Sequence, residues 1–221
     1  MRTVTFLAFA VVLAGGSAGA QTAAAPRETS STQAAAAQAD EKPWSFDASV
    51  YTYLLPDSGN YAQPTFATDH RWLHLEARVN YEDLDTGSAW VGYTFRVGTQ
   101  VEFELTPMVG AVFGNTNGVA PGYKGSLAWR ALELSSETEY VFDAADSADN
   151  FLYTWSELAV APADWWRVGV VVQRTKVYQT AFDIQRGFFV GFSYKRAEVT
   201  GYVFNPGTSQ PTVVIGVGLS F

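Results

Sequence analysis

The sequence predicts an all-β chain of about twelve strands that run up and down across a membrane and close into an antiparallel barrel. Three observations predict it: an alternating segment at the C-terminus, a regular succession of similar segments from Trp44 onward, and aromatic residues at both ends of these segments. Alternation of apolar with small or polar residues has the period of two that a β-strand requires, because successive side chains point to opposite faces of a sheet.

The last segment, residues 212–221, shows the alternation most clearly. Its apolar face carries Val213, Ile215, Val217, Leu219 and Phe221. Small or polar residues occupy the other face, with Val214 as the exception. At this point the chain resembles the Gram-negative outer-membrane β-barrel proteins, whose closing strand commonly ends in Phe with apolar residues at alternate positions before it. The resemblance is to a class of proteins, and it implies an outer-membrane location and assembly by the barrel-assembly machinery through the C-terminal strand, with Phe221, Leu219 and Val217 as the signal.

The first residues support the same location. Arg2 precedes an apolar stretch, 6–13, and the small residues around Ala18 and Ala20 fit a signal-peptidase site, so we expect a cleavable signal peptide over 1–20. The apolar stretch is about half of the ~20 residues that a membrane-spanning helix needs, and no later segment is long and apolar enough for one. Residues 21–43 are rich in Ala, Gln, Thr and Ser, which favours a flexible periplasmic linker, with a short helix that plugs the barrel as the alternative. Residues 44–221 are then the barrel.

The composition excludes several classes of partner and cofactor. Without Arg2 the chain has 14 − 1 = 13 Lys and Arg against 22 Asp and Glu, a net charge of −9, which argues against nucleic acid. The absence of cysteine rules out disulfides and thiolate metal sites, and we expect no cofactor and no metal. A secreted chain without disulfides can instead be held together by a closed ladder of strands.

Twelve segments with strand-like alternation are separated by residues that favour turns. They are 44–55, 61–68, 72–82, 88–98, 101–113, 122–129, 132–142, 151–161, 165–178, 184–195, 197–205 and 212–221. Tight turns alternate with longer loops rich in Gly, Asn, Asp and Pro, as expected for short periplasmic turns and longer external loops. Both chain ends then lie on the periplasmic side only if the number of strands is even. Ten strands is the alternative, because 61–68 has the weakest pattern.

Aromatic residues gather near the segment ends and predict two belts at the two membrane interfaces. The belt at the short turns would contain Trp44, Trp72, Trp129, Trp165, Trp166, Tyr194 and Phe221. The belt at the long loops would contain Tyr53, Tyr81, Phe113, Tyr140, Phe142, Tyr178 and Phe204. A soluble β-sandwich with aromatics in its core is the alternative, and it is less consistent with clustering at two ends.

Assigning the apolar face of each segment to lipid turns the charged residues inward. A charge on the lipid face at mid-membrane would cost about 2–4 kcal/mol, so this assignment is strongly preferred. The predicted pore-lining residues are Glu76, Arg78, Arg96, Glu102, Glu104, Lys124, Glu133, Glu137, Glu139, Glu157, Arg167 and Glu198. Four hydroxyl residues, Ser136, Thr138, Thr154 and Ser156, fall on the lipid face, and Pro107 on that face predicts a bulge or bend.

This interior predicts a porin-like passive channel for small solutes, since twelve strands leave a wider lumen than the side-chain-filled barrel of eight. The surplus of Glu favours cations or neutral solutes. Neighbouring opposite charges can instead cross-link the wall and fill the lumen, so a closed structural or interaction barrel is the alternative. The expected partners are outer-membrane lipids, lipopolysaccharide and small solutes.

A barrel lipid-modifying enzyme is the least favoured hypothesis. His70 and His74 are about 13 Å apart on a strand, so they cannot share one metal ion, and no motif marks a catalytic serine near them. Acidic residues in the long loops are interpreted as solvated charges, with divalent-cation bridging to lipopolysaccharide as the alternative. We therefore expect no enzymatic activity.

Overall fold

The structure is a computed structural model that describes residues 44–221 except 56–58, 176–182 and 210. The predicted signal peptide, 1–20, and linker, 21–43, lie outside the described residues. The elements are β1 (Ser45–Leu54), β2 (Tyr61–His70), β3 (Leu73–Val79), β4 (Thr86–Tyr93), β5 (Phe95–Val97), β6 (Val101–Gly114), β7 (Gly118–Trp129), β8 (Leu132–Asp143), η1 (Ser147–Asp149), β9 (Phe151–Ala163), β10 (Trp166–Thr175), β11 (Asp183–Tyr194), β12 (Ala197–Phe204) and β13 (Thr212–Ser220). Over the described ranges, no helix is long and apolar enough to cross a membrane.

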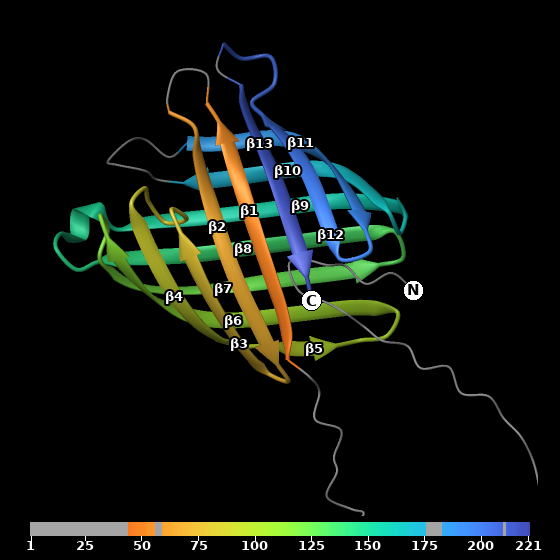
Figure 1. The fold of residues 1–221 in the computed structure, drawn as a ribbon, viewed down its shortest axis with the longest axis horizontal. Helices are drawn as coiled ribbons and strands as arrows, with labels where there is room; N and C mark the ends of the chain where they lie inside the picture. Colours follow the sequence, from red (N-terminus) through yellow and green to blue (C-terminus); the bar gives the residue numbers. More distant parts are fainter. Residues whose placement is uncertain (1–43, 56–58, 176–182, 210) are drawn as a thin grey trace, which may run out of the picture.

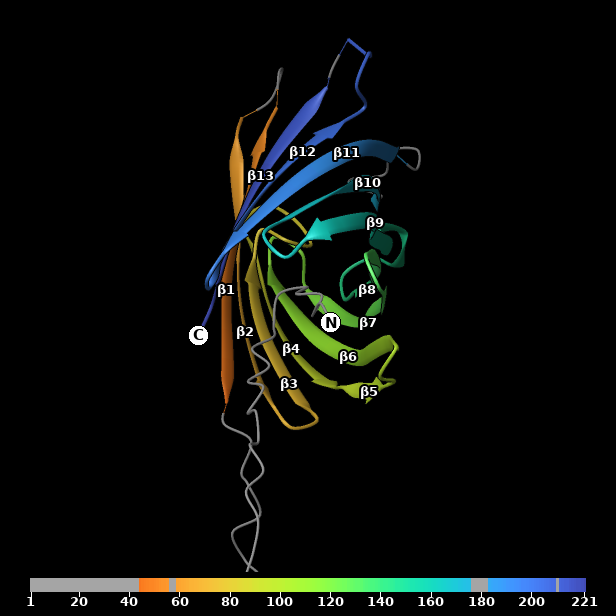
Figure 2. The same cartoon turned by 90° about the vertical axis from the view of Figure 1, so that its right-hand side faces the viewer.

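All the strands belong to one antiparallel sheet that closes on itself. Each strand pairs with its neighbours in the chain, and β1 pairs with β13 from Asp47↔Ser220 to Leu54↔Val213. The described chain has thirteen strand segments, but β4 and β5 are two pieces of one strand, because both pair with β6, so the barrel has twelve strands. The twelve-strand prediction is confirmed, and 61–68 is a true strand. Figure 1 shows β1, β2 and β13 crossing in front of β6 to β9, and Figure 2 shows the same walls from the side.

Pro107 interrupts the ladder in a different way from the expected bulge. The register between β4 and β6 (Gly92↔Met108) continues unchanged between β5 and β6 (Phe95↔Leu105), so no residue is inserted. Since proline has no N–H, it cannot donate to the neighbouring strand, and the ladder has a gap opposite Pro107 that separates β4 from β5. The prediction of a bulge was wrong, that of a bend stays a prediction, and the irregularity is the ladder donor that proline lacks.

The short connections are as tight as predicted. Four of them have two residues, between β2 and β3, β7 and β8, β9 and β10, and β11 and β12. In three of these turns the first residue, Arg71, Arg130 or Lys195, has a positive φ of 55–58°. Most loops at the opposite ends of the strands are longer, but the loop expected over 114–121 shortens to 115–117, because β7 already begins at Gly118. The loop between β8 and β9 contains the 3₁₀ turn η1, capped by the Asp146 carboxylate, which accepts from the Ala148 N–H.

The outer face of the barrel is apolar, as membrane lipid requires. Exposed Val, Leu and Phe side chains alternate with buried ones along the strands, for example Val168, Val170 and Val172 on β10. The four hydroxyl residues on this face satisfy one another: Ser136 Oγ lies 2.9 Å from Ser156 Oγ, and the Thr138 hydroxyl donates to Thr154 Oγ1 at 3.2 Å. Pairing of hydroxyls lowers the cost of placing them on a lipid face.

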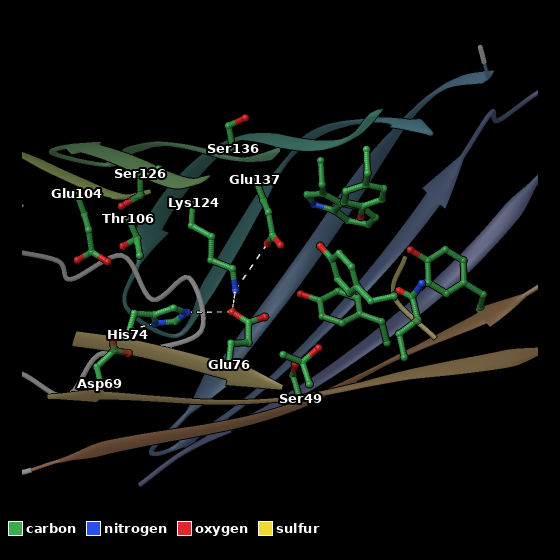
Figure 3. Close-up of a pocket in the computed structure, with 18 residues that line it drawn as sticks. Ser49, Asp69, His74, Glu76, Glu104, Thr106, Lys124, Ser126, Ser136 and Glu137 are labelled. Atoms are coloured by element: carbon green, nitrogen blue, oxygen red, sulfur yellow. Dashed lines mark hydrogen bonds and ion pairs between the residues drawn. The ribbon is translucent and has the colours of Figure 1, made fainter. Parts of the chain in front are cut away.

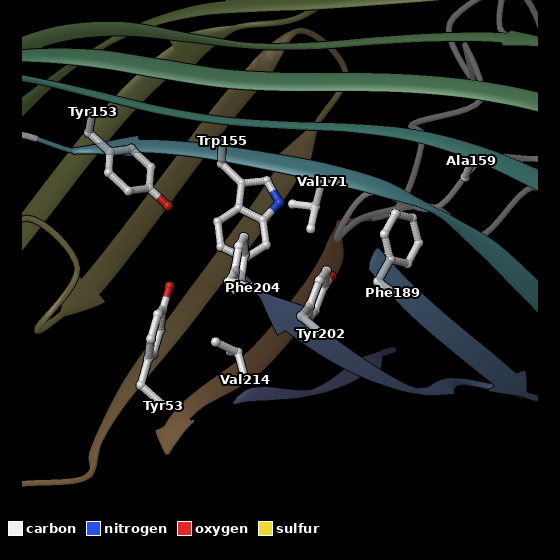
Figure 4. Close-up of a cluster of buried hydrophobic side chains, with 9 residues drawn as sticks. All are labelled: Tyr53, Tyr153, Trp155, Ala159, Val171, Phe189, Tyr202, Phe204 and Val214. Carbon is white, nitrogen blue, oxygen red and sulfur yellow. The ribbon is translucent and has the colours of Figure 1, made fainter. Parts of the chain in front are cut away.

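An aromatic cluster fills part of the interior (Figure 4). It consists of Tyr53, Tyr153, Trp155, Ala159, Val171, Phe189, Tyr202, Phe204 and Val214, all buried. The predicted interface belts are therefore only partly right. Most of their members are exposed, but Tyr53 and Phe204 are 4% and 0% exposed and lie in this cluster, Tyr81 packs against it, and Tyr178 lies outside the described residues.

Candidate functional site

Ten of the twelve predicted interior residues fall into three groups. Glu76, Arg78, Lys124, Glu137 and Glu139 meet in one place, Glu157, Arg167 and Glu198 in a second, and Arg96 and Glu104 form a pair nearer the short turns. Glu133 is buried on β8, and Glu102 borders a hollow at the short-turn rim together with Trp129 and Arg130.

Arg78 is the centre of the largest group, which we call the Arg78 network: Glu76, Arg78, Glu82, Lys124, Glu137 and Glu139. Its Nε donates to Glu76 at 2.6 Å, and its two terminal nitrogens lie 2.7 Å from carboxylate oxygens of Glu137 and Glu139. The guanidinium is fully buried, and its planar fork of donors suits several carboxylates at once. Because Arg78 lies on β3 and its partners Glu137 and Glu139 on β8, the network joins walls of the barrel that are not neighbours.

His74 and Lys124 extend this network towards the short turns (Figure 3). His74 Nδ1 lies 3.0 Å from Asp69 Oδ1, and His74 Nε2 lies 3.0 Å from Glu76 Oε2. Lys124 Nζ donates to the same Glu76 oxygen and lies 3.8 Å from Glu137. Both ring nitrogens of His74 thus face carboxylates, which leaves none to activate a serine.

The second group, the Arg167 cluster, is Glu157, Arg167, Glu198 and Tyr202. Arg167 donates to Glu157 at 3.0 Å and to Glu198 at 2.8 Å. The buried Glu157 also accepts from Tyr202 at 2.9 Å and from the Trp155 indole at 2.8 Å. Every oxygen of Glu157 is therefore bound, and Tyr202 on β12 is tied to β9 across three strand spacings.

Aromatic side chains also span the interior. The Tyr51 ring on β1 lies edge-on to the Trp155 ring on β9, with the ring centroids 6.0 Å apart. The Tyr81 and Tyr153 rings are also edge-on, with their centroids 5.1 Å apart. These pairs join walls that the sheet does not pair. The lumen is therefore narrower than the strand number alone suggests.

A cavity of about 70 Å³ remains between the aromatic pairs and the ion pairs. Tyr51, Tyr53, Tyr81, Tyr153 and Trp155 contribute the aromatic part of its lining, and the remainder consists of carboxylates and hydroxyls together with Gln63, His74, Lys124 and Gly125. Since about 10–15 Å³ suffices for one water, this space holds several waters or a small ion. The cavity extends to Glu104, which pairs with Arg96 at 2.8 Å and has a side chain 28% exposed, so it reaches towards the open rim.

Several residues of this site were not among the predicted ones: Asp47, Asp69, Glu82, Tyr51 and Trp155. Parity would have found Asp47 and Tyr51, which share the buried face of β1 with Ser49. Glu82 lies beyond the end of β3, where the strand period no longer applies.

Comparison with known proteins places the fold. No protein-family model matches the chain, and no curated protein sequence matches it. Its structure superposes on the KdgM porin with a TM-score of 0.60 and 14% identity, over 79% of this chain and 99% of that one. The KdgM porin in complex with disordered oligogalacturonate gives 0.59 and 12% over the same shares. The outer membrane protein Omp33 of Acinetobacter baumannii gives 0.46 and 8%, over 80% of this chain and 98% of that one.

The chain has a porin fold. The predicted resemblance to outer-membrane β-barrel proteins is confirmed at the level of the class. At 14% and 12% identity the likeness is one of architecture, so what passes through this barrel has to be argued from its own residues.

Proposed function

We propose that this protein is an outer-membrane channel that passes small solutes passively and prefers cations or neutral molecules. One observation carries the proposal: the interior of the closed barrel contains a cavity whose lining, among the described residues, includes the carboxylates of Asp69, Glu76, Glu104 and Glu137 and a single Lys side chain. Rings of carboxylates favour cations in a narrow water-filled passage, because the field of the charges is poorly screened there.

The charge of the interior argues against acidic sugars as the solutes of this channel. The KdgM porin is named in complex with oligogalacturonate, a chain of sugar carboxylates. Among the predicted pore-lining residues here, Glu outnumbers Arg and Lys together, and each basic residue already contacts at least one carboxylate. A polyanion would meet repulsion without a free basic partner, so the proposed solutes are cationic or uncharged.

A closed structural barrel is the second candidate, and the cross-links favour it. Arg78 joins β3 to β8, and the Tyr51–Trp155 contact joins β1 to β9, so side chains occupy much of the lumen. Under this alternative the same groups are structural cross-links and no ion passes.

An enzyme has less support. Both nitrogens of His74 face carboxylates, and His70 stacks on Trp44 with ring centroids 4.8 Å apart. We also propose that the barrel lies in the outer membrane, in contact with lipids and lipopolysaccharide. Residues 1–20 would be a cleavable signal peptide and 21–43 a linker. The barrel would assemble through its C-terminal strand. Exposure of Val217, Leu219 and Phe221 on the outer face supports that last element.

Current through the refolded protein in a planar bilayer tests the function. We expect discrete steps and, under a potassium chloride gradient, a reversal potential of the sign for cation preference. Glu102→Gln combined with Glu104→Gln should reduce that preference, since both carboxylates lie on the same face of β6 towards the short-turn rim. Asp164→Asn, in an exposed turn at the same rim, is the matched control and should leave it unchanged. Silence from protein shown to be folded would refute the channel and favour the closed barrel.

A further inference from the structure

The short turns of the barrel are rich in exposed positive charge. Four exposed basic residues lie in them: Arg71 between β2 and β3, Arg130 between β7 and β8, and Lys195 and Arg196 between β11 and β12. The five short connections, which the structure describes completely, contain a single acidic residue, Asp164. Over the described ranges, none of the four basic side chains forms an ion pair, so their charge is available to a ligand.

Two of these cations lie on the outer surface of the barrel. The Arg130 guanidinium lies 5.1 Å from the centroid of the Trp129 ring, and the Lys195 ammonium lies 5.2 Å from the centroid of the Tyr194 ring. Both rings are on the lipid side of their strands and are exposed, at 47% and 74%. A cation held over an outward-facing ring cannot at the same time reach into the lumen, so these two charges face the surroundings of the barrel and not the channel.

The order of side chains along the strands puts these cations at the depth of lipid headgroups. On β11 the exposed outward side chains are, in order towards the turn, Phe188, Val190, Phe192 and Tyr194. Lys195 follows directly, and β7 ends in the same way with Trp129 and Arg130. Apolar side chains suit the hydrocarbon core, amphipathic rings suit the interface, and cations suit the phosphate layer beyond it.

The turns themselves do not require these residues. Arg130 and Lys195 both have a φ of 55°, a conformation that favours Gly, Asn or Asp over a long side chain. We propose that the short-turn rim binds the phosphate headgroups of anionic phospholipids, with one site at Arg130 and Trp129 and another at Lys195 and Tyr194. In each site the cation pairs with the phosphate, and the ring packs against the glycerol and the first carbons of the acyl chains.

The charge of the chain as a whole makes such binding a local property. The formal net charge is −8. The described residues at the opposite rim include Asp83, Asp85, Asp143, Asp146 and Asp149. A chain of this charge repels an anionic lipid over most of its surface, so a preference for anionic over zwitterionic lipid has to come from the basic turns. The inference goes beyond the proposed channel and shares with it only the location in a membrane.

Native mass spectrometry of the refolded protein tests the two sites. The protein is released from detergent micelles that contain equal amounts of phosphatidylglycerol and phosphatidylcholine with the same acyl chains, and the lipids that stay bound are identified and counted. We expect phosphatidylglycerol to bind about fivefold more tightly than phosphatidylcholine, because each site adds one cation close to the phosphate. Inorganic phosphate should not displace it, since the ring and the acyl chains are part of the contact.

Variants at exposed turn positions assign the preference to the rim. Arg130→Gln should lose one of the tightly bound phosphatidylglycerol molecules, and Arg130→Gln combined with Lys195→Gln should reduce the preference over phosphatidylcholine to less than about twofold. Arg130→Lys keeps the charge and should keep the lipid. Arg96→Gln is the matched control: it removes the same charge from a side chain that pairs with Glu104 at 2.8 Å, and it should leave the number of bound lipids unchanged.

Equal binding of the two lipids by the wild-type protein would overturn the inference. An undiminished preference in the double variant would also overturn it, because the lipid would then bind elsewhere, and so would displacement by inorganic phosphate, because the site would then recognise a free ion. The lipid sites and the channel fail separately. A barrel that is silent in the planar bilayer but prefers phosphatidylglycerol keeps the sites and loses the channel, and one that conducts without this preference keeps the channel and loses the sites.

Discussion

Replacing Arg78 by Met should destabilise the barrel more than any other loss of a single charge. Of its partners, Glu76 would keep His74 and Lys124, and Glu137 would keep Lys124 at 3.8 Å. Glu139, whose side chain is fully buried, would lose its ion pair at 2.7 Å and remain as an uncompensated charge. Breaking a buried pair in this way costs about 3–5 kcal/mol. The guanidinium also lies 4.3 Å from the Tyr81 ring and 4.6 Å from the Trp90 ring, contacts worth about 1 kcal/mol.

Equilibrium urea unfolding in lipid vesicles, followed by tryptophan fluorescence, measures this loss. We expect Arg78→Met to lower the free energy of unfolding by about 4 kcal/mol or more, and Glu139→Gln in the same chain to restore about 2 kcal/mol by removing the unpaired charge. Arg96→Met is the matched control: its pair with Glu104 is about one third exposed and should be worth under about 1 kcal/mol. A loss no larger than that of Arg96→Met, or no recovery with Glu139→Gln, would refute the reasoning.

Three further changes test the packing, the lipid face and the constriction. Gly110→Ala should cost about 1–3 kcal/mol in the same urea assay, because the added Cβ would lie 2.4 Å from the Trp90 ring. Val170→Arg places a charge midway along β10 on the lipid face and should cost about 2–4 kcal/mol. Trp155→Ala removes the contact with Tyr51 across the lumen and should raise single-channel conductance in the planar bilayer, since it removes an aromatic ring from the interior.

Each of these changes has a control in the same chain. Gly218→Ala meets no atom within 4 Å and should be nearly neutral; an equal loss at both glycines would contradict the packing argument. Val97→Arg lies at a strand end, where an exposed charge should cost at most about 1 kcal/mol, and a cost independent of depth would argue against a membrane-spanning outer face. Trp165→Ala, at the exposed rim, should not change conductance, and an unchanged current in Trp155→Ala would place the constriction elsewhere.

Alternation predicted the strands and their number well because lipid on one side and polar side chains on the other leave little freedom in each segment. The same parity places Tyr53 with Asp47 and Phe204 with Glu198 on the inner face. Assigning those two aromatics to a membrane belt used their position along the strand and ignored their face. Ser136 and Thr138 departed from the expected pattern because they are polar residues on the apolar face. Their hydroxyls pair with those of Ser156 and Thr154, which makes them tolerable there.

The interior contacts were predictable only between neighbouring strands. The pairing of Arg96 with Glu104 follows from the hairpin of β5 and β6, in which the two residues lie directly opposite each other. The contacts of Arg78 with Glu137 and Glu139 join β3 to β8, and their formation depends on the curvature of the whole wall and the width of its cross-section. Neither quantity is encoded in the period of a strand, so the central ion network could not be derived from the pattern.

The pairing of β1 with β13 has a consequence for assembly. Every other ladder joins strands that follow one another in the chain, whereas this seam brings together Asp47 and Ser220, 173 positions apart. Local hairpins form early because they close short loops, so the seam should be the last ladder to form, and until then the sheet has two open edges. The two ends of the described barrel meet at the same seam, where Phe46 and Phe221 exchange both backbone hydrogen bonds at 2.9 Å. A circular permutant could join these two ends covalently and have its new termini in one of the long loops. Such a barrel would keep all its ladders, but the strands at its seam would be the two that flank the opened loop.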